Sequence, residues 1–222
     1  MSDTLKKWCG TVTAAGITAA VIVWWLIINI NSPHGNQFEA SGAVQMLVYG
    51  RLAGLLAGLS FVFLLVTMGK GRLSEKLFPK SWLVKIHRRL GGTVLFFVLL
   101  HFVLVFAAKS DLYDDSFFNL VSDFAADGKW GTAAVCGAVL LIAVLIFCLL
   151  FVLKKMKFQQ FKPTHYLVYA VVILLFFHQI FYGFDFVNHK AFRIFWTVLA
   201  ALALLDAVVW KIRTGLAAVK NA

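Results

Sequence analysis

Residues Ile86–Ala108 read IHRRLGGTVLFFVLLHFVLVFAA, an apolar run that contains two histidines, His87 and His101. The run is long enough for an α-helix to cross the hydrocarbon core of a bilayer, which is about 30 Å thick. Histidine is costly inside a membrane and usually marks a ligand site or a hydrogen-bonded partner there. The stretch therefore predicts a membrane-spanning helix that carries two functional side chains at different depths.

Five further apolar runs accompany this one, and together they decide the fold class. The chain is 61% apolar, above the share of about 45–50% that is usual for soluble domains. Each run is long enough to span a bilayer, or nearly so. We therefore predict an all-α fold, a polytopic membrane bundle of six transmembrane helices. The predicted spans are Val12–Ile30, Ala43–Met68, Ile86–Ala108, Thr132–Leu153, Tyr166–Phe184 and Ala191–Val209.

The distribution of charge predicts the orientation of these helices. Most of the 21 basic residues lie before the first span, in the second-to-third and fourth-to-fifth connections, and in the tail. Most of the 10 acidic residues lie in the other connections. Because cytoplasmic loops of membrane proteins are enriched in Lys and Arg, both termini are predicted to be cytoplasmic, in a multi-pass protein of the cell membrane. Orientation and contact with membrane lipid explain the basic excess, so no nucleic-acid partner is expected.

A second pair of histidines matches the first. His165 and His178 are 13 residues apart at the fifth span, and the histidines of the third span are 14 residues apart. At 1.5 Å per residue, each gap corresponds to about 20 Å along a helix. In the predicted orientation both spans run from inside to outside, so the first histidine of each lies at the inner leaflet. The sequence therefore predicts two cross-helix pairs, His87 with His165 and His101 with His178.

Each pair has the composition of a haem-iron site. A zinc ion needs three or four ligands gathered around it, and neither pair has carboxylates or thiolates nearby in the sequence. Two imidazoles on opposite faces of a porphyrin complete the coordination of its iron, and such iron favours electron transfer. We therefore predict two haem b groups. His87 and His165 would bind the inner iron, and His101 and His178 the outer iron.

The fifth span carries a geometric mismatch. On a straight helix, 14 residues leave two side chains about 40° apart in azimuth, but the 13 residues between His165 and His178 leave them about 140° apart. The fifth span is therefore expected to contain a local bulge or overwinding, or to present its imidazoles from different angles.

Motifs around these histidines resemble the ferric reductase-like transmembrane domain superfamily. They are IHRRLGG with LLH (86–92, 99–101), THYLVY with FFH (164–169, 176–178) and YGRLAGLLAG (49–58). That superfamily includes NADPH oxidases, ferric reductases and the haem-binding membrane subunit of a bacterial methionine sulfoxide reductase. The resemblance covers essentially all six spans, so residues 1–222 are expected to form one such haem-binding domain. The histidine spacing is similar to that of the two-haem branches.

The resemblance implies that electrons pass from the cytoplasm through the inner haem and then the outer haem to an external acceptor. The chain would then be the membrane component of an oxidoreductase. Full-length relatives hold FAD and NAD(P)H in dehydrogenase domains, whereas no GxGxxG or Walker-type loop occurs in this sequence. The donor is therefore expected on a separate cytoplasmic flavin dehydrogenase or on a missing C-terminal dehydrogenase domain. Ferric iron, oxygen, a quinone and a redox protein are all open as acceptors.

Three arginines are candidates for contacts with the haems or the acceptor. Arg88 and Arg89 follow the inner ligand and suit haem propionates, because guanidinium groups pair well with carboxylates. A solvated cytoplasmic cluster is the alternative for these two. Arg51 interrupts the second span near its outer end, where a charge is costly unless it is paired or snorkels to the surface. We interpret it as a residue of the outer acceptor site or as a partner of an outer propionate.

Two further patterns are interpreted as structural. Gly50, Gly54 and Gly58 form a small-xxx-small stripe, which is typical of close helix packing. Residues 114–126 combine acidic residues with apolar ones at near-helical spacing, which predicts a short amphipathic helix over the outer haem.

Other functions are compatible with histidines in membrane helices. A single-haem, quinol-linked membrane subunit of a methionine sulfoxide reductase-type system is one alternative. A histidine-based metal or proton transporter is another, although transporters favour acidic residues at mid-membrane and broken helices. Cysteine spacing gives no support to a disulfide scaffold or to c-type haem, because neither CxxC nor CxxCH occurs among Cys9, Cys136 and Cys148.

Overall fold

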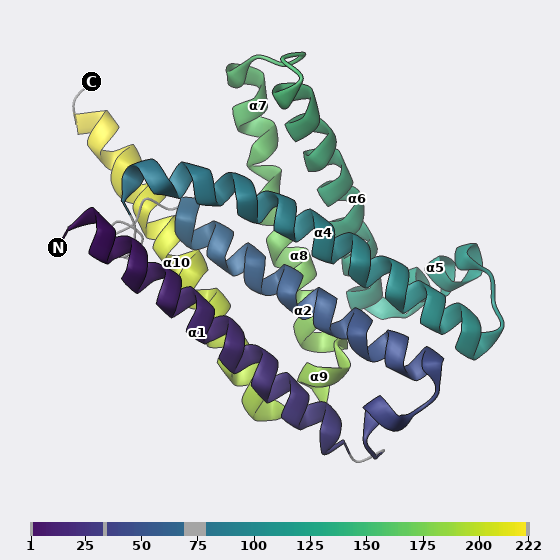
Figure 1. The fold of residues 1–222 in the computed structure, drawn as a ribbon. Helices are drawn as coiled ribbons and strands as arrows, with labels where there is room; N and C mark the ends of the chain where they lie inside the picture. Colours follow the sequence, from purple (N-terminus) through teal and green to yellow (C-terminus); the bar gives the residue numbers. More distant parts are fainter. Residues whose placement is uncertain (1, 33–34, 69–78, 221–222) are drawn as a thin grey trace. The chain divides into compact units, whose positions relative to one another are not determined.

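Helices make up almost all of the described chain, which comprises residues 2–32, 35–68 and 79–220 of a computed structural model (Figure 1). These residues contain no β-strand, and six of their helices are long and apolar enough to cross a membrane. The prediction of an all-α fold with six transmembrane helices is therefore confirmed. The chain forms two compact units, one of residues 1–112 and 191–222 and the other of residues 113–190.

Four long helices make up most of the described part of the first unit. Because a bilayer offers no water to pair with the backbone, an apolar segment there satisfies its amide groups internally as a helix. Ser2 caps the first helix by accepting a hydrogen bond from the amide of Leu5 (3.3 Å). Trp24 of that helix packs against Phe192 and Phe195 of the last one, with ring centroids 5.3 and 5.6 Å apart. The elements are α1 (Asp3–Ile30), the 3-10 helix η1 (Gln37–Glu39), α2 (Gly42–Met68), α4 (Lys80–Tyr113) and α10 (Lys190–Lys220).

The second unit is built on a helical hairpin, in which α6 lies alongside α7 and α8 (Figure 1). A Cβ atom at Gly137 of α6 would lie 2.9 Å from Cδ2 of Leu175, so the two arms pack closely there. The short helix α5 begins after Ser116, whose hydroxyl accepts a hydrogen bond from the amide of Asn119 (3.3 Å). The helix predicted within residues 114–126 is thus confirmed. The elements are α5 (Phe117–Ala126), α6 (Gly128–Val152), α7 (Phe158–His165), α8 (Leu167–Tyr182) and α9 (Phe184–Val187).

The fifth span is interrupted directly after His165. α7 ends at that residue and α8 begins at Leu167, with Tyr166 between them. The amide of Tyr166 donates to the carbonyl of Pro163, and the amide of Tyr169 donates to the carbonyl of Tyr166, both at 3.1 Å. These i→i+3 hydrogen bonds wind the chain more tightly than an α-helix does. The local overwinding that the histidine spacing predicts is therefore present.

The helices are longer than most of the predicted spans. α4 begins at Lys80 rather than Ile86 and ends at Tyr113 rather than Ala108. α10 continues to Lys220, beyond the predicted end at Val209. The difference arises because hydropathy marks only the part of a helix that suits the lipid core, whereas the helix itself continues into the polar interface.

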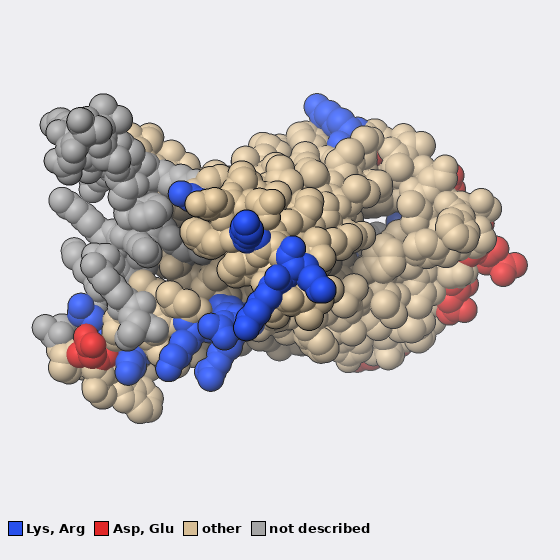
Figure 2. Space-filling model, turned by 90° about the horizontal axis from the view of Figure 1, so that it is seen from above, with Lys and Arg blue, Asp and Glu red and all other residues tan. Residues whose placement is uncertain are grey.

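α2 is the most enclosed of the long helices. In its most apolar stretch 61% of the residues are buried, against 6% for α4. By contrast, Phe96 of α4, Ile146 of α6 and Leu202 of α10 are each more than half exposed. Most of the molecular face drawn in Figure 2 is likewise uncharged. The outward-facing apolar side chains suit contact with lipid, and α2 is the helix around which the first unit packs.

Candidate functional site

His101 on α4 contacts the backbone of α2. Its Nδ1 is 2.8 Å from the carbonyl oxygen of Gly50. A carbonyl only accepts hydrogen bonds, so Nδ1 carries the ring proton and donates it. The lone pair of the neutral ring is then on Nε2, the nitrogen that can bind a metal. Histidines that bind a metal usually donate such a hydrogen bond from their other ring nitrogen.

Two glycines of α2 make room for this contact. A Cβ atom at Gly54 would lie 2.8 Å from Nδ1 of His101 and 3.0 Å from its Cε1. One at Gly50 would lie 2.9 Å from Cγ2 of Val105. Since real Cβ atoms do not come that close to other atoms, only glycine permits this approach. Close helix packing is therefore confirmed at these two positions, and the same glycines seat the ring of a predicted ligand.

His87 lies on the same uninterrupted helix as His101, 14 residues nearer its N-terminus. Its side chain is half-buried, whereas Arg88 and Arg89 are exposed. Their exposure is compatible both with binding of propionates and with a solvated cytoplasmic cluster. The first unit thus supplies one histidine of each predicted pair, and the second unit supplies the other two.

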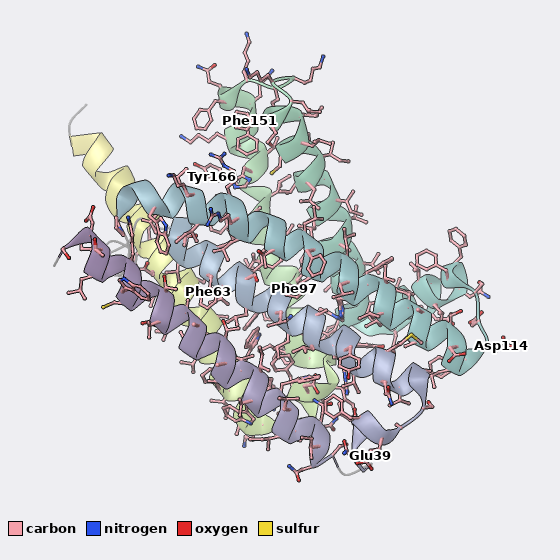
Figure 3. All side chains as sticks on the ribbon, viewed as in Figure 1. Glu39, Phe63, Phe97, Asp114, Phe151 and Tyr166 are labelled. Carbon is pink, nitrogen blue, oxygen red and sulfur yellow. The ribbon has the colours of Figure 1, made fainter. Side chains whose placement is uncertain are left out.

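His165, the last residue of α7, is held from two sides within the second unit. Its Nδ1 is 3.8 Å from Sγ of Cys148 on α6. Phe161, one turn earlier on α7, stacks on the imidazole with 4.9 Å between ring centroids. Phe151 of α6 stacks on Phe161 in turn, at 4.3 Å, near the turn that joins the two helices (Figure 3). Cys148 therefore contacts a predicted ligand, which nothing in its sequence context indicates.

His178 on α8 is flanked by aromatic rings. Phe124 of α5 packs against it at 5.6 Å with the ring planes 78° apart, and Tyr182 stacks on it at 5.6 Å and 26°. The hydroxyl of Tyr182 donates a hydrogen bond to Oδ2 of Asp127 (2.5 Å), which ties the end of α8 to the start of α6. The predicted amphipathic helix thus touches His178, the predicted outer ligand of the fifth span.

Arg51 on α2 is bound by two amide side chains of its own unit. Its Nη2 donates hydrogen bonds to Oδ1 of Asn29 (2.7 Å) and to Oε1 of Gln37. Asn29 is fully buried and donates to the carbonyl of Trp25 (2.9 Å), while Gln37 donates to Oγ of Ser32 (2.9 Å). The guanidinium group is thus hydrogen-bonded within the protein by side chains that are themselves anchored. Sequence reasoning missed both amides, although a polar Asn at the end of an apolar run was a usable signal.

We expect Asn29→Ala to destabilise the protein by about 1.5–3 kcal/mol, because the change removes a hydrogen bond to a charged group. Thermal unfolding in detergent, followed by circular dichroism, measures the effect. The matched control is Asn31→Ala at the end of the same helix, where the side chain is exposed and the expected change is below about 0.5 kcal/mol. Equal unfolding midpoints for the two variants would contradict this account of Arg51.

The donor atoms suit haem better than a bare ion. In the part of the chain that the structure describes, no three or more His, Cys, Asp and Glu side chains gather to hold a metal ion. The helices instead carry separate imidazoles. Nδ1 of His101 faces Gly50 of a neighbouring helix, and Nδ1 of His165 faces Cys148 of another. Haem iron fits this arrangement, because the porphyrin supplies four ligands and the protein only the axial ones.

Comparison with known families also points to haem, at the level of the family. A family model described as "Ferric reductase like transmembrane component" matches residues 50–177. The match spans more than half of the chain, includes Arg51 and three of the four predicted ligand histidines, and ends one residue before His178. No curated protein and no solved structure matches the chain. Domains of this family generally bind haem and transfer electrons across membranes. This multi-pass membrane protein therefore belongs to the family of ferric reductase-like transmembrane components.

Proposed function

We propose that this chain transfers electrons across the membrane through two bis-histidine haem b groups. His87 and His165 would hold the inner haem. His101 and His178 would hold the outer haem. When bound, haem b takes up and gives off one electron at a time. The observation that carries the proposal is the hydrogen bond from Nδ1 of His101 to the carbonyl of Gly50, because it orients Nε2 of an intramembrane histidine as a ligand.

The ligand set restricts where an acceptor can react. Two histidines on each iron would leave no coordination position for oxygen or another small ligand. An acceptor would then bind against the protein beside the outer site. Ferric iron, oxygen, a quinone or a redox protein can each take an electron in that way.

Arg51 is the residue that we propose for this outer site. Asn29 and Gln37 fix its guanidinium group near the outer end of α2. There it suits a haem propionate or an anionic acceptor, since a guanidinium fork binds carboxylates and similar groups well. On the inner side, Arg88 and Arg89 are exposed directly after His87, and we propose the corresponding role towards the inner propionates for them.

We propose that the electrons come from a cytoplasmic flavin dehydrogenase, either a separate protein or a C-terminal domain, which holds FAD and NAD(P)H. The positive-inside distribution of charge supports cytoplasmic termini and a cytoplasmic connection between α6 and α7. Lys154, Lys155 and Lys157 in that connection are exposed. They offer an acidic donor a basic surface at the start of α7, the helix that ends at the inner ligand His165.

The test is a haem-quantified visible spectrum of the purified protein, both oxidised and reduced with dithionite. Two low-spin b haems per chain are expected. One haem per chain would instead support a single-haem, quinol-linked subunit of the methionine sulfoxide reductase type. No haem after reconstitution would overturn the proposal and return the histidines to transport or packing.

A further inference from the structure

The Nδ1 atoms of His101 and His165 meet acceptors of very different strength. That of His101 lies 2.8 Å from a backbone carbonyl oxygen, whereas that of His165 lies 3.8 Å from the sulfur of Cys148. A carbonyl oxygen is a good hydrogen-bond acceptor and a thiol sulfur a weak one. The two rings are therefore polarised differently by the helices that neighbour them.

The contact between Cys148 and His165 belongs to an ordered layer between α6 and α7. Cys148 and Phe151 are three residues apart on α6, and Phe161 and His165 are four apart on α7, so each pair lies on one helix face. The rings of Phe151 and Phe161 stack at 4.3 Å and 13°, and those of Phe161 and His165 at 4.9 Å and 28°. The stack fixes the plane of the imidazole, and this keeps Nδ1 directed at the thiol.

We propose that Cys148 is a positioning residue that sets the reduction potential of the inner haem through His165. The inference rests on the proposed function, in which Nε2 of His165 binds the iron. Nδ1 then carries the ring proton and donates it to Sγ of Cys148. A hydrogen bond from the distal ring nitrogen raises the basicity of the ligand, and a more basic ligand stabilises ferric over ferrous iron. The thiol thus lowers the potential of the inner haem.

A potentiometric titration of the two-haem protein tests this assignment. The inner component is identified as the one that disappears in His165→Ala. In Cys148→Ala, which has no acceptor, we expect the equilibrium constant for reduction of that component to rise two- to tenfold, at most about 59 mV for one electron. Cys148→Val also lacks an acceptor but retains more of the packing volume, and it should shift the potential in the same direction.

Cys136→Ala is the matched control, because Cys136 lies on the same helix with an exposed side chain. It should leave both components unchanged. An inner component that does not move in the two Cys148 variants, or an equal shift of both components, would overturn the role of Cys148 while leaving the two-haem function intact. A wild-type chain that binds no haem would overturn the proposed function and this inference together.

Discussion

Replacing His101 with leucine should remove one haem per chain and leave the other in place. The outer iron would retain a single imidazole, and the leucine side chain is compatible with a lipid-embedded helix. Haem content per chain, measured from the reduced pyridine complex, should fall from two to one. Membrane insertion should be unchanged, because α4 is an uninterrupted helix of 34 residues whose central stretch is strongly apolar without its histidines.

The control for this experiment is His189→Ala. His189 lies between α9 and α10, outside the spanning helices, so its loss should leave haem content at the wild-type value. Retention of two haems in His101→Leu, at normal insertion, would refute the assignment of the outer ligand. Loss of both haems would show that the two sites do not form independently.

Gly54→Ala should weaken binding of the outer haem without removing any ligand. The new methyl group would lie 2.8 Å from Nδ1 of His101, so the imidazole must leave the position in which it donates to Gly50. Loss of the hydrogen bond that orients a ligand typically costs about 10- to 100-fold in affinity. Haem titration of the apoprotein measures this, and a His165→Ala background isolates the outer site.

Gly16→Ala is the matched control for that change. Gly16 lies on α1, and a Cβ atom there would have nothing within 4 Å, so haem affinity should not change. In a His101→Leu background Gly54→Ala should have no further effect on haem content, because the two changes act through the same ring. An undiminished affinity in Gly54→Ala would show that the contact does not orient the ligand.

The sequence was sufficient for the number of spans, because each long helix contains an apolar run. It was also sufficient for the distortion near His165, because the 13-residue spacing does not fit a regular helix face. α4 and α10 extend beyond their apolar runs, since a helix is not limited to the thickness of the lipid core. The number of spanning helices and the spacing of side chains along one helix can thus be predicted before any contact between helices is known.

Contacts between helices could not be predicted from the sequence in the same way. Asn29 and Gln37 bind Arg51 from 22 and 14 residues away, and Cys148 meets His165 across a helical hairpin. Nothing in the spacing of these residues distinguishes them from ordinary packing positions. Gly54 belongs to a recognisable stripe of glycines, which predicts that some neighbour packs closely against it. The stripe does not predict that this neighbour is the ring of His101.

The turn at Tyr166 divides the fifth span into two helical segments, with His165 at the end of one and His178 within the other. Side chains on one continuous helix keep a fixed azimuth relative to each other. Here the winding at the turn sets the angle between the two imidazoles instead. A substitution that changed this winding would rotate one ring relative to the other while leaving both side chains in place.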